Sequence, residues 1–475
     1  MKPAVQVLST TEIAKIQEAS LSILHEIGMR LPLEKVQSSL KDAGCTIDGD
    51  VVKIPPAVVG QAIKTAPKRD QVVLFARDPR FDVSFAAHDP ALACMTMATN
   101  VIDPHTGVKR PAVTTDLVKL VRIADRLDFV RVNGGLVTPQ EIPGKVNDWY
   151  TWASCIKNSV KHITGGVLDG RCVRDSARMA ALACGGEEQF RRRPSISGWV
   201  LTLPPLGIDP GSLEALVEMA SLNIPAIVSS GPILGATSPV TMAGTIAQAH
   251  AEILACLVVS QLTSPGAPFV YTSFARGMDM RSGNVSMAGP EFAALKVAMA
   301  QMGRSLELPI RMPAMLRDAK TLDAQAGFET GMVASLASCG ADIMDSMQLD
   351  MDIVVDYADL VFCNECMTAL NRFNKGVTVG DDHIALEVIR SVGPGGTYLA
   401  HEHTMKNFRD ELWHPELLER RNWERWEADG SRDIRTVSLE KCLELMELEP
   451  RDYPPPPVRD EIDRIVEQAR LDYEA

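Results

Sequence analysis

The sequence predicts an α/β protein built on a (β/α)8 TIM barrel, with an N-terminal cap and a C-terminal helical extension. From about residue 128 onward, short apolar runs alternate with longer stretches of helical character. The runs are apolar on both faces, as in strands of a parallel sheet covered by helices. A doubly wound open sheet is the competing architecture, but no Gly-rich dinucleotide-binding motif follows the first run. We therefore favour the closed barrel.

The predicted barrel spans residues 128–404, between a cap at 1–127 and an extension at 405–475. Its eight strand candidates, in chain order, are "FVRVNGGLV", "VKHITGGVL", "SISGWVLTL", "IPAIVSSGP", "APFVYTSFA", "LPIRMPAML", "ADIMDSM" and "GTYLAHEHT". The sixth candidate contains Leu308–Pro313. Between strands, 239–263 is expected to be helical, and 323–339 places Phe328, Met332, Leu336 and Cys339 on one helical face.

Composition excludes several classes of protein. A net charge of -13 and a pI near 5.3 disfavour nucleic-acid binding, which needs clustered basic side chains. No uninterrupted apolar run of about 18 residues and no signal-peptide pattern occur, so we expect no membrane span and a cytoplasmic protein. Ten scattered cysteines suit a reducing compartment. The lone CxxC pair, Cys363 and Cys366, has no second pair nearby and predicts ordinary thiols rather than a zinc site.

The chemistry of a (β/α)8 barrel lies at the C-terminal ends of its strands. In this sequence those ends are mostly small, apolar or neutral, for example Ser229–Gly231 and Ser346–Gln348. No HExxH, G-x-S-x-G or phosphate-binding loop is present, which disfavours hydrolysis and hydride transfer. His401 and His403 could point the same way off a strand as metal ligands, but no third ligand is evident, and ordinary hydrogen-bonding histidines are favoured.

Several segments in fixed order resemble the trimethylamine methyltransferase superfamily. They are "GATSPVTMAGTIAQAHAEILACLVVSQLTSPGAPFVY", "DAQAGFE" and "HTMKNFRDELWHP", together with the N-terminal "SLSILHEIGMRL" and "VVKIPPAVV". The resemblance covers nearly the whole chain. It implies a barrel enzyme that moves a methyl group from an amine to the cobalt of a corrinoid on a separate cognate protein. No D-x-H-x-x-G motif of a corrinoid-binding chain appears, so the corrinoid is expected to come with that partner.

One departure from the family pattern concerns Leu316. In the trimethylamine enzymes a pyrrolysine precedes the segment that matches "RDAK", Arg317–Lys320, and this chain has Leu316 there. The chain therefore resembles the non-pyrrolysine branch, whose members demethylate quaternary amines such as glycine betaine. A quaternary ammonium departs as a neutral tertiary amine and needs no general acid. The enzyme has mainly to hold the N-methyl group in line and exclude water.

The expected substrate-binding residues follow from this chemistry. Aromatic faces hold a methylammonium group, and the candidates are Tyr271, Phe274 and Trp152. Arg311 could hold a betaine carboxylate, or could instead pair with Asp342 or Asp345 inside the barrel. Arg317, beside Asp318, is expected in a structural ion pair. The remaining predicted site residues are Leu316 and Gln348, with His401 and His403 as possible carboxylate-binding or orienting groups.

The predicted function is methyl transfer from a quaternary amine, with glycine betaine the leading substrate and dimethylglycine the product. The same reaction on carnitine, butyrobetaine, proline betaine or a methylated thioether remains open. A non-catalytic betaine-binding barrel is the alternative of another class. We assign no metal site and no tightly bound cofactor, and we expect a homo-oligomer.

Overall fold

The computed structural model describes residues 3–474, except 88–89, 96, 449–450 and 452. Its centre is a parallel sheet of eight strands in the order β13-β12-β11-β10-β9-β6-β17-β16. A parallel bridge between Tyr271 and Ile310 joins the two ends of this order and closes the barrel. The strands are β6 (Ala91–Ala93), β9 (Val130–Gly134), β10 (His162–Gly166), β11 (Ile196–Leu201), β12 (Ala226–Ser230), β13 (Phe269–Ser273), β16 (Arg311–Pro313) and β17 (Ile343–Asp345). The predicted (β/α)8 fold is confirmed.

Seven of the eight strand candidates lie in the barrel, and one is wrong. The segment 396–404 forms no strand, and His401 there is the N-cap of helix α15, Glu402–Glu411. The missing strand is β6, inside the segment predicted as the cap, and it pairs with β9 and β17. A run of three residues, Ala-Leu-Ala, is too short to show a strand period, so only the neighbouring strands identify it. The segment around Arg311 is the seventh barrel strand rather than the sixth.

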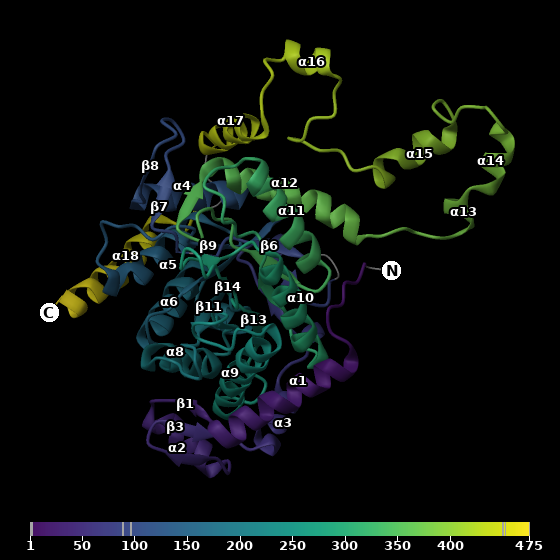
Figure 1. Ribbon diagram of the computed structural model, residues 1–475. Coiled ribbons are helices and arrows are strands. Elements are labelled where there is room, and N and C mark those ends of the chain that lie inside the picture. Colours follow the sequence, from purple (N-terminus) through teal and green to yellow (C-terminus); the bar gives the residue numbers. More distant parts are fainter. Residues whose placement is uncertain (1–2, 88–89, 96, 449–450, 452, 475) are drawn as a thin grey trace.

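Helices cover the outside of the barrel, one after each strand (Figure 1). In chain order they are α4 (Thr114–Arg126), α5 (Asn147–Asn158), α6 (Gly170–Ala183), α8 (Pro210–Ser221), α9 (Met242–Thr263), α10 (Pro290–Ser305), α11 (Ala324–Ser338) and α12 (Tyr357–Asn374), with the short α7 (Glu187–Arg192) after α6. In the described residues, α9 alone is long and apolar enough to cross a membrane by composition, but 83% of its apolar stretch is buried. That burial is typical of a core helix.

Helix α11 buries a different face from the one that the sequence predicts. Phe328 is 68% exposed, and the buried side carries Ala326, Thr330, Val333 and Ala337. Small side chains let α11 approach its neighbours closely, so the buried face is the one with little side-chain volume. The large apolar residues of this helix therefore did not identify its contact face.

The N-terminal region packs in two places. Helices α1 (Thr10–Ser22), α2 (Glu34–Asp42) and α3 (Pro56–Thr65) contact α9, beside a small antiparallel sheet. That sheet consists of β1 (Met29–Arg30), β3 (Val51–Lys53) and β2 (Thr46–Asp48). The hairpin of β4 (Val73–Leu74) and β5 (Val83–Ser84) then covers one end of the barrel. Its residues Leu74 and Phe85 pack with Val270 and Ile343 in the barrel interior. Because this hairpin lies at the N-terminal ends of the strands, only the opposite end is available for a ligand.

The remaining strands and helices surround the open end and the outer surface. The strands are β7 (Asn100–Ile102), β8 (Lys109–Pro111), β14 (Gly277–Met278), β15 (Val285–Ser286) and β18 (Val354–Asp356). Helix α17 (Ile434–Met446) packs on α12 and α4, and α18 (Pro456–Glu474) packs on α5 and α6. Between α12 and α17, the helices α13 (Asp381–Ile384), α14 (Leu386–Val392), α15 and α16 (Trp423–Ala428) bury no residue. Figure 1 shows α13, α14 and α15 standing away from the barrel.

A fully buried ion pair ties the loop after β16 to α12. Arg317 donates from Nη1 to Asp359 Oδ1 at 2.6 Å and from Nη2 to Asp359 Oδ2. Both side chains are 0% exposed. The predicted structural ion pair of Arg317 is confirmed, but its partner is Asp359. The adjacent Asp318 instead accepts hydrogen bonds from Ser286 Oγ and Met287 N.

Arg317→Met is expected to destabilise the protein by about 3–5 kcal/mol, because it leaves the Asp359 carboxylate buried without its partner. Replacing both residues, Arg317→Met with Asp359→Leu, should recover a large part of that loss. Urea unfolding of the two variants and the wild type measures the difference. A single-variant loss below about 1 kcal/mol would show that the pair is not buried as described.

Candidate functional site

A cavity of about 190 Å³ opens at the C-terminal ends of the barrel strands. Its wall comes from six of the eight strands or the loops that follow them. The lining residues are Met95, Met97, Trp199, Leu201, Ile227, Ser229, Phe274, Arg311, Ser346 and Asp352. This is the end of the barrel at which such folds place their chemistry.

Three polar side chains form a row across neighbouring strands of the cavity wall. Ser229 on β12 pairs in register with Thr272 on β13, and Arg311 on β16 donates from Nη1 to Thr272 Oγ1 at 3.3 Å. Ser229 is 3% exposed, and its hydroxyl has no hydrogen-bond partner among the described residues. A buried hydroxyl without a partner is costly, so a ligand atom is the natural partner for it.

Arg311 pairs with Asp345, one of the two acidic partners that the sequence left open, and it also lines the cavity. Its Nε donates to Asp345 Oδ2, and Asp345 lies on the adjacent strand β17. The other candidate partner, Asp342, is held instead by Arg69 and Arg304. The pairing with Asp345 occupies Nε only, and the guanidinium also lines the cavity. Arg311 can therefore be anchored by Asp345 and still present N–H donors to a ligand.

Burial dominates the electrostatics of Asp345. The carboxyl is 0% exposed, and burial raises its pKa to about 6, an effect that Arg311 and the Ser346 hydroxyl partly offset. Ser346 Oγ donates to Asp345 Oδ1 at 3.0 Å. As pH falls through about 6, Asp345 gains a proton and the positive charge of Arg311 loses its compensation. A ligand anion at Arg311 is then bound more tightly at the lower pH.

Trp199 is the aromatic wall that the sequence analysis missed. It lines the cavity, and its Nε1 donates to Thr164 Oγ1 at 2.8 Å, which fixes the ring. Phe274 also lines the cavity, as predicted, but the Arg276 guanidinium carbon lies 4.9 Å from its ring centroid and Lys296 Nζ lies 5.9 Å from it. The ring of Phe274 is thus already engaged by the Arg276 guanidinium. Trp199 was detectable as the one aromatic residue of its strand candidate, "SISGWVLTL".

Lys296 is a fully buried amine behind this wall. Its Nζ donates to the carbonyl oxygens of Ser273 at 2.8 Å and Ala275 at 2.9 Å, on both sides of Phe274. Burial lowers its pKa well below the ordinary value, and the nearby Arg276 and Arg311 lower it further. These two hydrogen bonds hold the loop after β13 in place.

Other predicted aromatic and histidine site residues lie elsewhere. Tyr271 points to the outer side of its strand, where its hydroxyl is 2.8 Å from His250 Nδ1. Trp152 packs against Gly165 from α5, outside the barrel wall. His401 and His403 lie on the exposed segment that carries α15, away from the strand ends. The prediction that these two histidines stand at a strand end is wrong, because the strand they were assigned to does not exist.

Leu316 and Gln348 are fully buried but are not among the residues that line the cavity. Leu316 belongs to the large core cluster between the barrel and its helices. The side-chain amide of Gln348 makes no hydrogen bond among the described residues, and its backbone oxygen accepts from Arg317 N at 3.1 Å. Their role in substrate binding stays a prediction.

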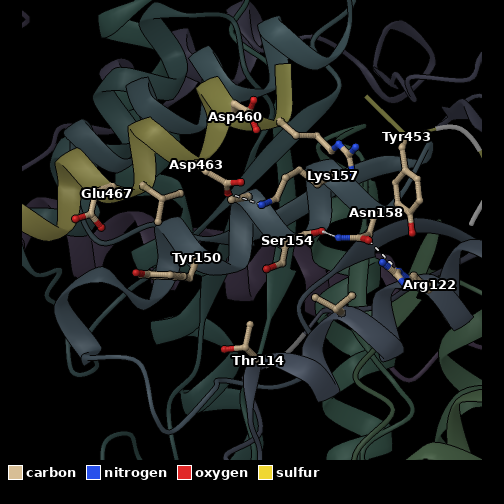
Figure 2. A pocket seen from close by; sticks show the side chains of 14 residues that line it. Thr114, Arg122, Tyr150, Ser154, Lys157, Asn158, Tyr453, Asp460, Asp463 and Glu467 are labelled. Carbon is tan, nitrogen blue, oxygen red and sulfur yellow. Dashed lines mark hydrogen bonds and ion pairs between the residues drawn. The ribbon is translucent and has the colours of Figure 1, made fainter. Parts of the chain in front are cut away.

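A second hollow, of about 880 Å³, lies outside the barrel between α4, α5 and α18. Figure 2 shows that Lys157 is paired with Asp463 there, and that Arg122 contacts Asn158. Opposite charges from the two sides thus neutralise one another across this groove. Its position on the outer surface separates it from the strand ends, and we do not assign the chemistry to it.

The described residues contain no group of three or more His, Cys, Asp or Glu side chains that could hold a metal ion. Cys363 and Cys366 are free thiols on α12. Cys363 Sγ lies 3.5 Å from Arg317 Nη2, next to the buried ion pair. Burial raises the pKa of both thiols, which disfavours their reactive thiolate form.

Comparison with known proteins identifies the family of this chain. A model of the trimethylamine methyltransferase (MTTB) family matches residues 1–470. A trimethylamine methyltransferase MttB of Desulfitobacterium hafniense (strain DSM 10664 / DCB-2) is 30% identical over 459 residues, which cover 96% of this chain and 91% of the relative. A glycine betaine methyltransferase of Desulfitobacterium hafniense (strain Y51) is 30% identical over 465 residues, covering 97% and 95%.

Among solved structures, the monomethylamine methyltransferase MtmB of Methanosarcina barkeri aligns with a TM-score of 0.48 and 13% identity, over 96% of this chain and 92% of that chain. The family match spans nearly the whole sequence, and the two relatives cover nearly all of it. The chain belongs to the trimethylamine methyltransferase family, as its motifs indicated, and is a methyltransferase.

Proposed function

We propose that this protein transfers a methyl group from a quaternary amine, with glycine betaine the leading substrate, to Co(I) of a corrinoid on a separate cytoplasmic protein. The observation that carries the proposal is the composition of the barrel cavity. An aromatic and thioether wall faces a buried guanidinium and a serine hydroxyl without a partner. A betaine has the matching pair of ends, a methylated cation and a carboxylate.

The cationic end of the substrate would lie against Trp199. A tryptophan face is the strongest aromatic partner for a quaternary ammonium, contributing about 0.5–2 kcal/mol according to desolvation. Met95 and Met97 extend this wall with polarizable thioethers. These side-chain surfaces need no hydrogen bond from a ligand, and an N-methyl group can form none.

The carboxylate end would be held by Arg311 and Ser229. Burial of a carboxylate without donors is strongly unfavourable, and charge-assisted hydrogen bonds from a guanidinium offset it. Arg311 and Ser229 flank Thr272 on neighbouring strands, so one carboxylate can accept from both. This arrangement also satisfies the buried Ser229 hydroxyl.

The reaction needs little acid–base chemistry from the protein. A corrinoid carried by its own protein supplies the nucleophile, and the amine leaves in neutral form. The side chains of this chain orient the N-methyl group and exclude water from it. Leu201, Leu203, Val240 and Met280 are exposed apolar side chains on the strand-end loops, a surface that suits docking of a corrinoid-bearing partner.

The cavity volume supports a small substrate. About 190 Å³ is below the range of about 300–1,000 Å³ typical of sites for drug-sized ligands, which favours a compact molecule. Glycine betaine is smaller than carnitine, butyrobetaine or proline betaine. The name of the glycine betaine methyltransferase relative supports the same choice.

A methyl-transfer assay tests the function directly. The purified chain, mixed with a Co(I) corrinoid, should consume glycine betaine and form dimethylglycine, with loss of the Co(I) absorbance. Trimethylamine should react far more slowly, because its neutral form is a poor methyl donor and Leu316 replaces the activating residue. Binding of glycine betaine without any transfer would identify a non-catalytic binding barrel, and comparable turnover of trimethylamine would contradict the assignment of the branch.

The role of Arg311 predicts opposite effects at the two ends of its ion pair. Arg311→Met should weaken glycine betaine binding by about 2–5 kcal/mol, and Arg311→Lys by less, because an ammonium lacks the planar fork. Asp345→Asn should strengthen glycine betaine binding, since the charge of Arg311 is no longer compensated. It should also remove the pH dependence of that binding near pH 6. Choline, which has no carboxylate, is the control ligand in calorimetry. Equal losses for both ligands in every variant, with lowered melting temperatures, would assign Arg311 to the scaffold alone.

The two aromatic walls are expected to contribute unequally. Trp199→Leu should weaken glycine betaine and choline alike, by about 1–2 kcal/mol, because both present the same trimethylammonium head. Phe274→Leu is the matched control and should cost less, since Arg276 already occupies its ring. Calorimetric titrations of both variants measure the difference. A larger loss at Phe274 than at Trp199 would place the cation at the other wall.

A further inference from the structure

An acidic side chain, Asp352, lies on the cavity wall in addition to Arg311. Among the described lining residues, Arg311 is the cationic member, Asp352 is the acidic one, and the others are uncharged. Burial and, more weakly, the charge of Asp352 raise the pKa of Asp345. Burial lowers the pKa of Arg276, and Asp352 partly offsets that effect. The Asp352 carboxylate is therefore close enough to the cavity to act on a charged ligand.

Asp352 belongs to a loop with an unusual backbone. The loop follows β17, and four of its residues other than glycine have positive φ angles: Ser346 at 69°, Asp350 at 52°, Met351 at 57° and Asp352 at 77°. Side chains rarely adopt this left-handed region, although aspartate and asparagine tolerate it best. A segment keeps such a conformation only where its surroundings enforce it. The tertiary structure thus holds Asp352 in its place on the wall.

The support for this loop comes from the segment after β16. Asp350 N donates to the carbonyl oxygen of Ala319 at 2.9 Å. Met351 N donates to the carbonyl oxygen of Arg317 at 3.0 Å. Arg317 is fixed in turn by its buried ion pair with α12. The position of Asp352 therefore rests on contacts that lead into the body of the protein.

We propose that Asp352 is a specificity-determining residue whose carboxylate lies beside the substrate ammonium, so that the cavity selects a zwitterion with neighbouring charges. This inference rests on the proposed function and extends it. Arg311 lies on β16, and Asp352 follows the adjacent strand β17, so the partners for a carboxylate and for an ammonium come from neighbouring parts of the wall. One methylene group separates the two charges of glycine betaine. The wider spacing in carnitine or butyrobetaine fits this arrangement less well.

Asp352 supplies a kind of selectivity that an aromatic wall lacks. The ring of Trp199 attracts a quaternary ammonium, but it also packs against an uncharged group of the same shape. A carboxylate distinguishes the two groups, because it attracts only the charged one. In a cavity of about 190 Å³, one trimethylammonium group can contact Trp199 on one side and Asp352 on another.

The proposed contact acts on binding rather than on the rate of methyl transfer. The methyl group leaves without the electron pair of its bond to nitrogen, so the nitrogen loses its positive charge during the reaction. The attraction to Asp352 is therefore strongest for the bound substrate and weaker in the transition state. An interaction of this kind lowers KM and does not raise kcat. Removing it should weaken binding without slowing the reaction at saturating substrate.

Calorimetry of Asp352→Asn with three ligands tests the proposal. Asparagine keeps the shape of the side chain and tolerates a positive φ angle, so the backbone need not change. The dissociation constants of glycine betaine and choline, which both carry the ammonium, should rise about tenfold or more. The control ligand is tert-butylacetate, in which carbon replaces the nitrogen of glycine betaine, and it should bind no more weakly than to the wild type. Asp352→Gly, which removes the side chain without backbone strain, should give the same pattern.

Asp350→Asn is the matched control variant. It makes the same change in the same loop, also at a positive φ angle, but the Asp350 carboxylate pairs with Lys109 and Lys320 and does not line the cavity. It should alter the three dissociation constants by less than about twofold. Equal effects of Asp350→Asn and Asp352→Asn would attribute the change to the loop and overturn the role of the Asp352 carboxylate.

The other outcomes separate this inference from the function on which it rests. A wild type that binds neither glycine betaine nor choline overturns both. Binding that Asp352→Asn and Asp352→Gly leave unchanged, or weakening of all three ligands alike, overturns the role of Asp352 alone. In single turnovers with a Co(I) corrinoid, the rate at saturating glycine betaine should not fall in Asp352→Asn. A fall as large as the loss of affinity overturns the role of Asp352 as well.

Discussion

The alternation of side chains along a closed parallel barrel decides what each residue on a strand can do. Residues in register on neighbouring strands point to the same side of the wall. Ile343 packs in the barrel interior, so its register partner Arg311 must also point inward. Tyr271, next to the inward Thr272, must point outward to His250. Closing the sheet thus separates a ligand-facing set from a packing set, and a shift of one residue would exchange them.

The barrel interior accommodates ionisable side chains because each of them has a hydrogen-bond partner. Arg311 is anchored by Asp345, and Asp345 is also held by the hydroxyl of Ser346. Lys296 donates to two carbonyl oxygens, and burial lowers its pKa. A buried charge without a partner would be expensive, so these contacts are the condition for a guanidinium at the cavity. The result is a cavity wall that carries one guanidinium, Arg311, among mostly apolar side chains, with Ser229, Ser346 and Asp352 as its other polar members.

The two ends of the barrel differ: one is covered and the other holds the cavity. The N-terminal end is closed by the β4–β5 hairpin, whose side chains fill the interior beneath the cavity. The C-terminal end keeps the cavity and a set of exposed apolar loops.

The sequence by itself determined the class of fold, seven of the eight strands, the ion pair of Arg317 and the family. These follow from local alternation, from composition and from motifs in fixed order, which are properties of the chain. Only the tertiary structure decided that β6 is the eighth strand, that Asp359 rather than Asp318 pairs with Arg317, and that Trp199 rather than Tyr271 faces the cavity. The segment with His401 and His403 looks strand-like in isolation, yet His401 caps helix α15 and His403 lies in that helix. Each of these outcomes depends on which distant residues come into register, and a local pattern carries no information about that pairing.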